Sequence, residues 1–234
     1  VCDGIGFAKR KDIVVVTINY RLGFFGFFAT LVANYGPELI GDYGRTLIIY
    51  YVVCFVYLLV FSPIYATFGG GKGAAKVMFK NLFKPAAVSF GTCSSVATIP
   101  TNMEAAKETG ISEEVSNIVL PLGATINMDG TAIYQGVCAV FIASCFGIDL
   151  TLTQTLTIVL TATLASIGTA GVSGAGMIML AMVLQSVGLP LEGIALVAGI
   201  DRILDMGRTV VNITGDAACA VIVSHMDDRS PARK

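Results

Sequence analysis

Residues 46–68 read TLIIYYVVCFVYLLVFSPIYATF and contain no charged side chain. A helix of this length, at about 1.5 Å per residue, spans the roughly 30 Å hydrocarbon core of a bilayer. The chain has little charge with which to cover such a surface, because 13% of its residues are charged and 55% are hydrophobic. A soluble domain carries about a quarter charged residues. The sequence therefore predicts an all-α membrane protein. The net charge of -1 says nothing about nucleic acid, but no basic patch interleaves with aromatic residues, so no nucleic-acid partner is expected.

The positive charge after this stretch predicts its orientation. Four lysines follow with no acidic residue between them: Lys72, Lys76, Lys80 and Lys84. Because Lys and Arg are enriched in cytoplasmic loops, we expect residues 69–84 to form a basic cytoplasmic loop and residues 226–234 a cytoplasmic tail. Residues 22–68 are then two transmembrane helices, and the protein is expected to cross the cell (inner) membrane several times.

Beyond residue 85 the apolar stretches are interrupted by small and polar residues. The interruptions are SSVAT at 94–98, NMDGT at 127–131 and ASIGTAGVSGAG at 165–176. Non-helical backbone at membrane depth persists only inside protein or along a wet cavity. We therefore expect the first and third to be tips of re-entrant helical hairpins, and the second to be an unwound point in a spanning helix. The alternative is ordinary packing of small residues between helices, but three interruptions in order favour broken helices.

The same order of elements occurs twice. A broken hairpin followed by a polar-interrupted helix is expected at 85–146 and again at 154–224, although the two halves share little residue identity. Corresponding interrupted segments in repeated halves are typical of inverted-repeat transporters, where they mark the binding site.

The last helix carries an unusual polar face. Five residues recur at spacings of 4, 3, 4 and 4, which places them on one side of a helix: Asp201, Asp205, Arg208, Asn212 and Asp216. A charge at the bilayer centre costs several kcal/mol, so it indicates function. A purely structural ion-pair ladder is the alternative, but such a ladder requires neither Asn212 nor a second carboxylate two turns later.

These residue types suit an acidic substrate and a cation. The Arg208 guanidinium matches a carboxylate bidentately, and Asp205 can accept from an ammonium group. Backbone N–H groups at the hairpin tips, near helix N-termini, suit a second carboxylate. Asp129 and Asp216 offer hard oxygens for Na⁺, or either carboxylate can carry a proton.

Three motifs, NMDGTAIYQG, ASIGTAGVSGAG and DRILDMGRTVVNITGD, closely resemble the dicarboxylate/amino acid:cation (Na⁺ or H⁺) symporter family, the glutamate transporter homologues. The resemblance covers residues 22–225, with a transport core at 85–225. It implies symport of an acidic amino acid (aspartate or glutamate) with Na⁺ or H⁺ as coupling ion, by alternating access, in a homotrimer. A C4-dicarboxylate symporter of the same family, and a non-transporting truncated membrane fragment, are the alternatives.

The resemblance also implies residue roles. The substrate-binding residues are Ser94, Ser95, Thr131, Gly168, Gly171, Asp205, Arg208, Thr209 and Asn212. One cation site comprises Gly123, Asn127, Asn212 and Asp216. A second, made mainly of carbonyls, comprises Thr125, Ser166, Ile167 and Thr169. Asn127 and Asp129 form half of a third. The second hairpin is expected to be the extracellular gate.

The sequence departs from the family pattern in three places. The early family helices, which supply scaffold and the other half of the third cation site, do not appear in the chain. Cys93 stands where archaeal amino acid carriers have Arg, while Arg202 adds a charge beside the binding face. Ser173 replaces a proline usual in the second tip, which is expected to loosen the gate.

An atypical N-terminal segment, residues 1–21, lies outside this resemblance. Residues 12–27, DIVVVTINYRLGFFGF, resemble a short part of a type-B carboxylesterase and indicate a fusion or junction. An esterase needs a G-x-S-x-G nucleophile elbow and a histidine base. The candidate elbow at residues 171–175 lacks its final glycine, and His225 is the only histidine. The protein is therefore not expected to be an enzyme.

Overall fold

A computed structural model describes residues 38–228. Within that range every regular element is a helix, so the all-α prediction is confirmed. Three helical stretches are long and apolar enough to cross a membrane by length and composition: Gly41–Gly70, Glu113–Cys145 and Asp201–Asp227. The chain divides into two units, residues 1–45 and 46–234; the first described helix crosses this boundary, and every later helix belongs to the second unit. The atypical N-terminal segment and the esterase-like stretch lie outside the described residues.

The first spanning stretch consists of α3 (Glu38–Val56), a π-helical turn (Tyr57–Phe61) and α4 (Ser62–Gly70). It presents large apolar side chains outward, including Ile48 and Leu59, which are 67% and 68% exposed. Water would make this surface costly, whereas bilayer hydrocarbon would cover it. The inner side is fixed by Tyr50, whose hydroxyl donates to the Leu204 carbonyl at 3.0 Å. The prediction of a spanning helix over 46–68 is confirmed in length and composition.

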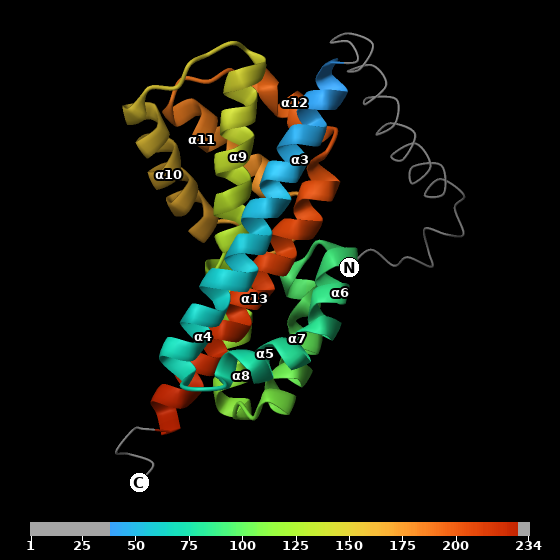
Figure 1. Cartoon of the computed structure of the whole chain (residues 1–234), viewed down its shortest axis with the longest axis vertical. Coiled ribbons are helices and arrows are strands. Elements are labelled where there is room, and N and C mark those ends of the chain that lie inside the picture. Colours follow the sequence, from blue (N-terminus) through green and yellow to red (C-terminus); the bar gives the residue numbers. More distant parts are fainter. Residues whose placement is uncertain (1–37, 229–234) are drawn as a thin grey trace, which may run out of the picture. The chain divides into compact units, whose positions relative to one another are not determined.

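The basic segment 69–84 was expected to be a loop, but it contains helix α5 (Ala74–Asn81). The helix forms because its sequence, AAKVMFKN, is rich in good helix formers and has an apolar side to bury. Met78 is 2% exposed and packs in a cluster with Ala66, Leu120 and Val221. The lysines remain exposed, so the segment is a short amphipathic helix at one end of the bundle (Figure 1).

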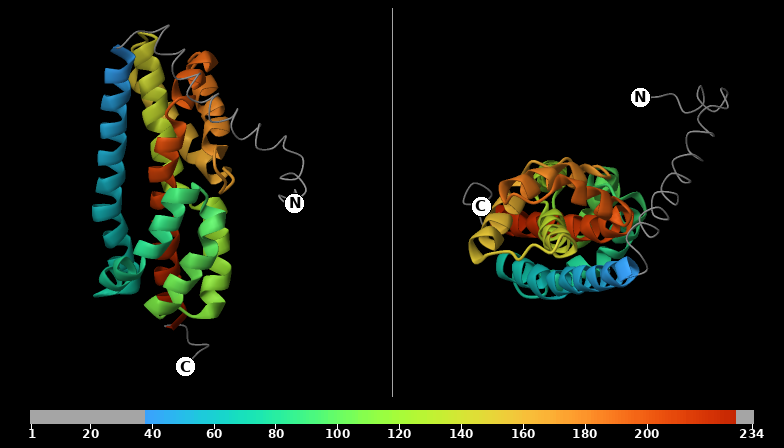
Figure 2. Two further views of the ribbon diagram at one scale, coloured as in Figure 1. Left: turned by 90° about the vertical axis from the view of Figure 1, so that its right-hand side faces the viewer. Right: turned by 90° about the horizontal axis from the view of Figure 1, so that it is seen from above.

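Two helical hairpins follow the predicted pattern. The first consists of α6 (Phe83–Thr92) and α7 (Ser95–Thr109), where the Ser94 side chain caps α7 by accepting from the Ala97 N–H at 3.2 Å. The second consists of α10 (Leu152–Ile167) and α11 (Ala175–Ser186), and α10 begins with a capping box at Thr151. The hairpins approach from opposite ends of this unit, and their tips face each other (Figures 1 and 2).

A broken helix follows each hairpin. Helices α8 (Glu113–Ile126) and α9 (Asp129–Cys145) are interrupted at Asn127 and Met128, as NMDGT predicts. After a 3₁₀ turn (Leu191–Gly193), α12 (Ile194–Ala198) is separated from α13 (Asp201–Asp228) by Gly199 and Ile200. The apolar run 193–224 is thus two helices. Helix α13 packs against α4, α6, α8 and α9. The depth of the hairpins in a bilayer stays a prediction.

Candidate functional site

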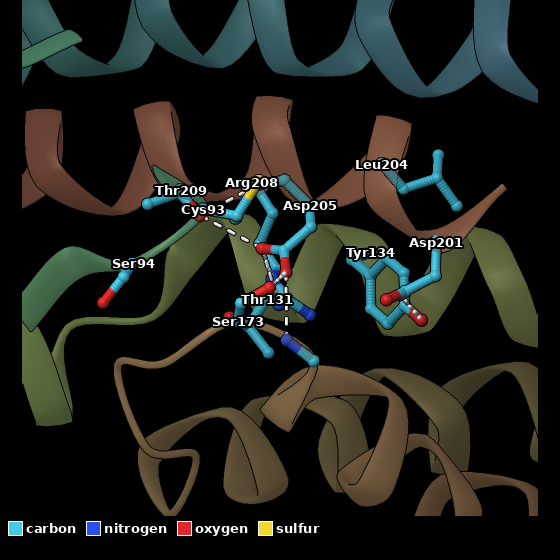
Figure 3. A network of polar contacts seen from close by, with 12 residues as sticks. Cys93, Ser94, Thr131, Tyr134, Ser173, Asp201, Leu204, Asp205, Arg208 and Thr209 are labelled. Atoms are coloured by element: carbon cyan, nitrogen blue, oxygen red, sulfur yellow. Dashed lines mark hydrogen bonds and ion pairs between the residues drawn. The ribbon is translucent and has the colours of Figure 1, made fainter. Parts of the chain in front are cut away.

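Helix α13 buries its polar face. Asp205 and Asp216 are 1% exposed, and Arg208 and Asn212 are 3% exposed. Their partners lie mainly on α9, at Asn127 in the break before it, and on the second hairpin tip, as Figure 3 shows for Asp205. Asp201, at the start of α13, is less buried and accepts from the Tyr134 hydroxyl at 2.7 Å. The spacing-based prediction of a single polar face is therefore confirmed.

Arg208 and Asp205 form a buried ion pair. Nη2 of Arg208 lies 2.7 Å from Oδ1 of Asp205, and Nε donates to the same oxygen at 3.1 Å. The guanidinium lies over the Tyr134 ring, 5.0 Å from its centroid. Nη1 is buried and has no hydrogen-bond partner within the part of the chain that the structure describes. A buried charged donor without a partner carries a desolvation cost of about 1–3 kcal/mol or more, so this nitrogen is suited to an anionic acceptor.

The remaining oxygen of Asp205 faces the second hairpin tip. Oδ2 accepts from the Gly174 N–H at 3.1 Å and from the Ser173 hydroxyl at 3.3 Å. Thr209 donates to Oδ1 at 3.1 Å, so both oxygens of the carboxylate are engaged. A proline at position 173 could make no such side-chain contact. Ser173, which was expected to loosen the tip, therefore adds a polar tie between the tip and α13.

The two tips meet above this pair. The Gly171 carbonyl accepts from the Val96 N–H at 3.1 Å and from the Ser94 hydroxyl at 2.9 Å. Gly171 is also tightly packed, because a Cβ there would lie 2.2 Å from the Ala124 carbonyl oxygen. A cavity of about 10 Å³ lies beneath the tips, which is space for about one water molecule. A larger ligand can enter only if a tip moves.

Asn212 connects this cavity to a second polar cluster. Its Oδ1 accepts from the Gly130 N–H at 2.8 Å, and its Nδ2 donates to Thr131 at 3.3 Å. Its backbone carbonyl accepts from Asn127 at 3.2 Å. Asn127 also donates to Oδ1 of Asp216 at 2.9 Å. A Cβ on Gly123 would lie 2.5 Å from that same Asp216 oxygen, so a glycine leaves room for the carboxylate.

The third acidic residue belongs to the same region. The Tyr57 hydroxyl, from the π-helical turn, donates to Oδ2 of Asp129. Asp129 and Asn127 both pack against Gly215, since a Cβ there would lie 3.0 Å from Oδ2 of Asp129 and 2.4 Å from the Asn127 amide nitrogen. The described residues hold no group of three or more His, Cys, Asp or Glu side chains fit for a metal ion. A cation here would therefore depend on carboxylate, amide and carbonyl oxygens together, a donor set that suits hard cations.

The structure brings most of the predicted substrate residues together. The cavity is lined by Ser95, Thr131, Gly171, Asp205, Arg208, Thr209 and Asn212, with Cys93 and Thr169 beside them. Ser94 reaches this group through its bond to Gly171. Gly168 is an exception, because it is exposed at the end of α10 and does not line the cavity.

The predicted cation residues divide into two groups. The first group is Gly123, Asn127, Asn212 and Asp216, which lie in close proximity, and Asp129 approaches the same Gly215 that Asn127 contacts. In the second set Ser166 and Thr169 are buried, but each hydroxyl donates to a carbonyl of its own segment, Thr163 or Ala165. Thr125 and Ile167 are exposed. A site made of backbone carbonyls from these segments stays a prediction.

Sequence reasoning did not identify several partners. Tyr57, Tyr134, Met128, Gly174 and Gly176 contact the predicted residues. Tyr134 lies within the recognised NMDGTAIYQG motif, so its position next to the unwound point was an available signal. Tyr57 lies more than 70 positions from Asp129 in an apolar helix, and no spacing rule connects the two.

Helical hairpins, interrupted helices and a buried polar site indicate a helical membrane protein, and interrupted helices around a polar site are typical of secondary transporters. The profile of the Sodium:dicarboxylate symporter family matches residues 12–226, and the chain belongs to that family. The match includes the esterase-like stretch from residue 12 onward and begins ten residues before the boundary expected from the motifs.

Individual relatives agree with this assignment. The chain is 36% identical over 220 residues to a proton/sodium-glutamate symport protein of Bacillus subtilis, covering 90% of this chain and 49% of the relative. It is 41% identical over 229 residues to an excitatory amino acid transporter of Onchocerca volvulus, covering 94% and 46%. It is 43% identical over 150 residues to human neutral amino acid transporter A, covering 64% and 28%. The chain thus spans half or less of the length of these relatives.

Proposed function

We propose that the complete protein is a secondary active symporter that moves an acidic amino acid, aspartate or glutamate, together with Na⁺ or H⁺. The observation that carries this proposal is Nη1 of Arg208, a buried charged donor with no partner in the described residues. A substrate carboxylate would satisfy it with a charge-assisted hydrogen bond. A neutral side chain would leave it unpaired, so this site favours acidic substrates over neutral ones.

Recognition of the amino group is proposed to involve Asp205. Its Oδ2 accepts from Ser173 and Gly174 of the second tip, so a substrate ammonium can take those positions when the tip moves away. The Asp205 carboxylate thereby links substrate binding to movement of the second tip. This supports the second hairpin as the gate. It also favours an amino acid over a C4-dicarboxylate, which has no amine to offer Asp205.

Coupling to a cation is proposed to pass through Asn212. Its side chain contacts Gly130 and Thr131 beside the substrate cavity, and its carbonyl contacts Asn127, which is bonded to Asp216. A cation bound among Asn127, Asp129, Asp216 and this carbonyl would fix Asn212, and with it Thr131. Each ligand would then bind more tightly to a site that the other has ordered.

The apolar spans favour a multi-pass location in the cell membrane, with lipid covering α3 and α4. We propose a homotrimer for the complete protein by analogy with the family. Alternating access would move the helices around the site against the rest of the assembly.

Uptake measurements test these assignments. The protein and a full-length relative are reconstituted in liposomes, and entry of labelled aspartate, glutamate, succinate and alanine is measured with and without inward Na⁺ and H⁺ gradients. We expect aspartate or glutamate uptake that depends on the Na⁺ or H⁺ gradient, both by the full-length relative and by the complete protein. Faster succinate uptake would favour the dicarboxylate alternative, and uptake independent of either gradient would contradict symport. Transport by the relative but not by this chain would favour a non-transporting fragment.

A further inference from the structure

Arg202 lies on the first turn of α13 and is exposed, in contrast to the buried Arg208. Its guanidinium contacts both hairpins. Nη2 donates to the Gly91 carbonyl of α6 at 3.0 Å, and Nη1 donates to the Ser173 hydroxyl of the second tip at 3.1 Å. Gly91 and Ser173 are 82 positions apart in the chain, so one side chain joins the ends of both hairpins.

The contact with Gly91 satisfies a helix end. Helix α6 ends at Thr92, so the Gly91 carbonyl is among the last four of the helix and lacks an intrahelical partner. A cationic donor near a helix C-terminus is also favoured by the helix dipole. The following residue, Cys93, turns the chain with a φ of 54°. Arg202 therefore supports the turn at the first tip from outside.

The contact with Ser173 fixes the direction of a hydroxyl. A serine hydroxyl has one donor and can accept elsewhere. Because Ser173 accepts from Arg202, its own proton is left for Oδ2 of Asp205, to which it donates at 3.3 Å. Asp205 is thus engaged by Arg208 directly and by Arg202 through Ser173.

We propose that Arg202 is a positioning residue that ties the two hairpin tips together and directs Ser173 toward Asp205, which keeps the tips closed over the cavity. The role in tip closure is independent of the transport activity proposed above; only its effect on substrate affinity depends on that activity. Arg202 contacts neither the cavity nor the predicted cation residues in the structure.

Hydrogen exchange of the purified protein in lipid nanodiscs tests the tie directly. We expect Arg202→Gln to accelerate amide exchange at residues 91–96 and 168–174 roughly fivefold, the effect of losing about one net hydrogen bond. Arg45→Gln is the matched control, because Arg45 is an exposed arginine on α3 and belongs to neither hairpin. Unchanged exchange at both tips in Arg202→Gln would overturn the proposal.

Two further variants test whether the directed hydrogen bonds of Arg202, rather than its charge alone, hold the two tips together. Arg202→Lys keeps the charge but lacks the planar fork that reaches two acceptors in fixed directions, so it is expected to resemble Arg202→Gln. Wild-type exchange in Arg202→Lys would show that charge alone suffices. Adding Ser173→Ala to Arg202→Gln is expected to accelerate exchange at residues 168–174 by less than the sum of the two single variants, because Ser173→Ala removes the contact with Arg202 as well as the bond to Asp205. Additive acceleration would contradict the Ser173 part of the proposal.

Transport separates this inference from the proposed function. If Arg202→Gln opens the tips but wild-type protein transports no acidic amino acid, the positioning role stands and the substrate assignment fails. If wild-type transports aspartate and Arg202→Gln leaves tip exchange unchanged, the positioning role fails alone. Where both stand, the KM for aspartate is expected to change in Arg202→Gln and stay constant in Arg45→Gln.

Discussion

Gly176 of α11 lies directly against the guanidinium of Arg208. A Cβ atom at position 176 would be 1.7 Å from Nη1 and 2.7 Å from Cζ, distances that no folded protein tolerates. The buried position of Arg208 therefore depends on a glycine in the second hairpin, which is 32 positions away in the chain. This contact therefore links the packing of the second hairpin to the position of Arg208, the proposed substrate residue.

Gly176→Ala should displace the guanidinium and weaken its pair with Asp205. We expect destabilisation of about 1–3 kcal/mol from overpacking, together with reduced aspartate affinity. Gly136→Ala is the matched control on α9, where a Cβ would meet no atom within 4 Å. That variant should be neutral or gain up to about 1 kcal/mol from helix propensity. Equal unfolding midpoints for the two variants in detergent would contradict the packing argument.

The main helices of this fold could be predicted from the sequence, because a membrane allows few backbone structures other than helices. An apolar run such as 46–68 has few options other than a spanning helix, and the spacing from Asp205 to Asp216 can form one face only in a helix. The break at Asn127 and Met128 could also be predicted, since polar residues interrupt an apolar run there. These features are local, and periodicity or composition reveals them.

The features that were missed depend on contacts between distant segments. Helix α5 forms where a basic loop was expected, because Met78 finds an apolar cluster supplied by α4, α8 and α13. The bond from Tyr57 to Asp129 and the close approach of Gly176 to Arg208 likewise require the packed structure. Ser173 is an example. The sequence shows that the usual proline is replaced by serine, but it does not show the two hydrogen bonds that this serine forms.

Cys93 is the single non-glycine residue with positive φ among those described, and it is 1% exposed. The left-handed conformation costs an L-residue roughly 1–2 kcal/mol, whereas glycine adopts it readily. We therefore expect Cys93→Gly to be more stable than Cys93→Ala by about 1 kcal/mol, as measured by denaturant unfolding. The alanine variant controls for loss of the thiol, and equal stability of the pair would show that the turn stores no such cost.

Tyr57→Phe removes the hydroxyl that donates to Asp129. Without that donor a partly buried carboxylate loses a charge-assisted bond, so the cation-free protein should be less stable by about 1–3 kcal/mol. Sodium, if it binds Asp129, should recover part of this difference, and its half-saturation concentration should fall. Tyr65→Phe is the control, because Tyr65 contacts the Tyr57 ring but not Asp129. A thermal-stability deficit unaffected by Na⁺ would place the cation elsewhere.

Arg208→Cys gives the sharpest test of the substrate assignment. The variant removes both the pair with Asp205 and the Nη1 donor proposed for the substrate carboxylate, so aspartate affinity should fall by at least about 100-fold, the scale of a lost charge-assisted contact. Breaking a buried ion pair also destabilises a protein by about 3–5 kcal/mol, which by itself could abolish binding. The double variant Arg208→Cys with Asp205→Asn removes the unpaired charge, so it should recover most of the stability while aspartate affinity stays low. Wild-type aspartate affinity in the stable double variant would show that neither residue recognises the substrate, because only their mutual pairing would then have mattered.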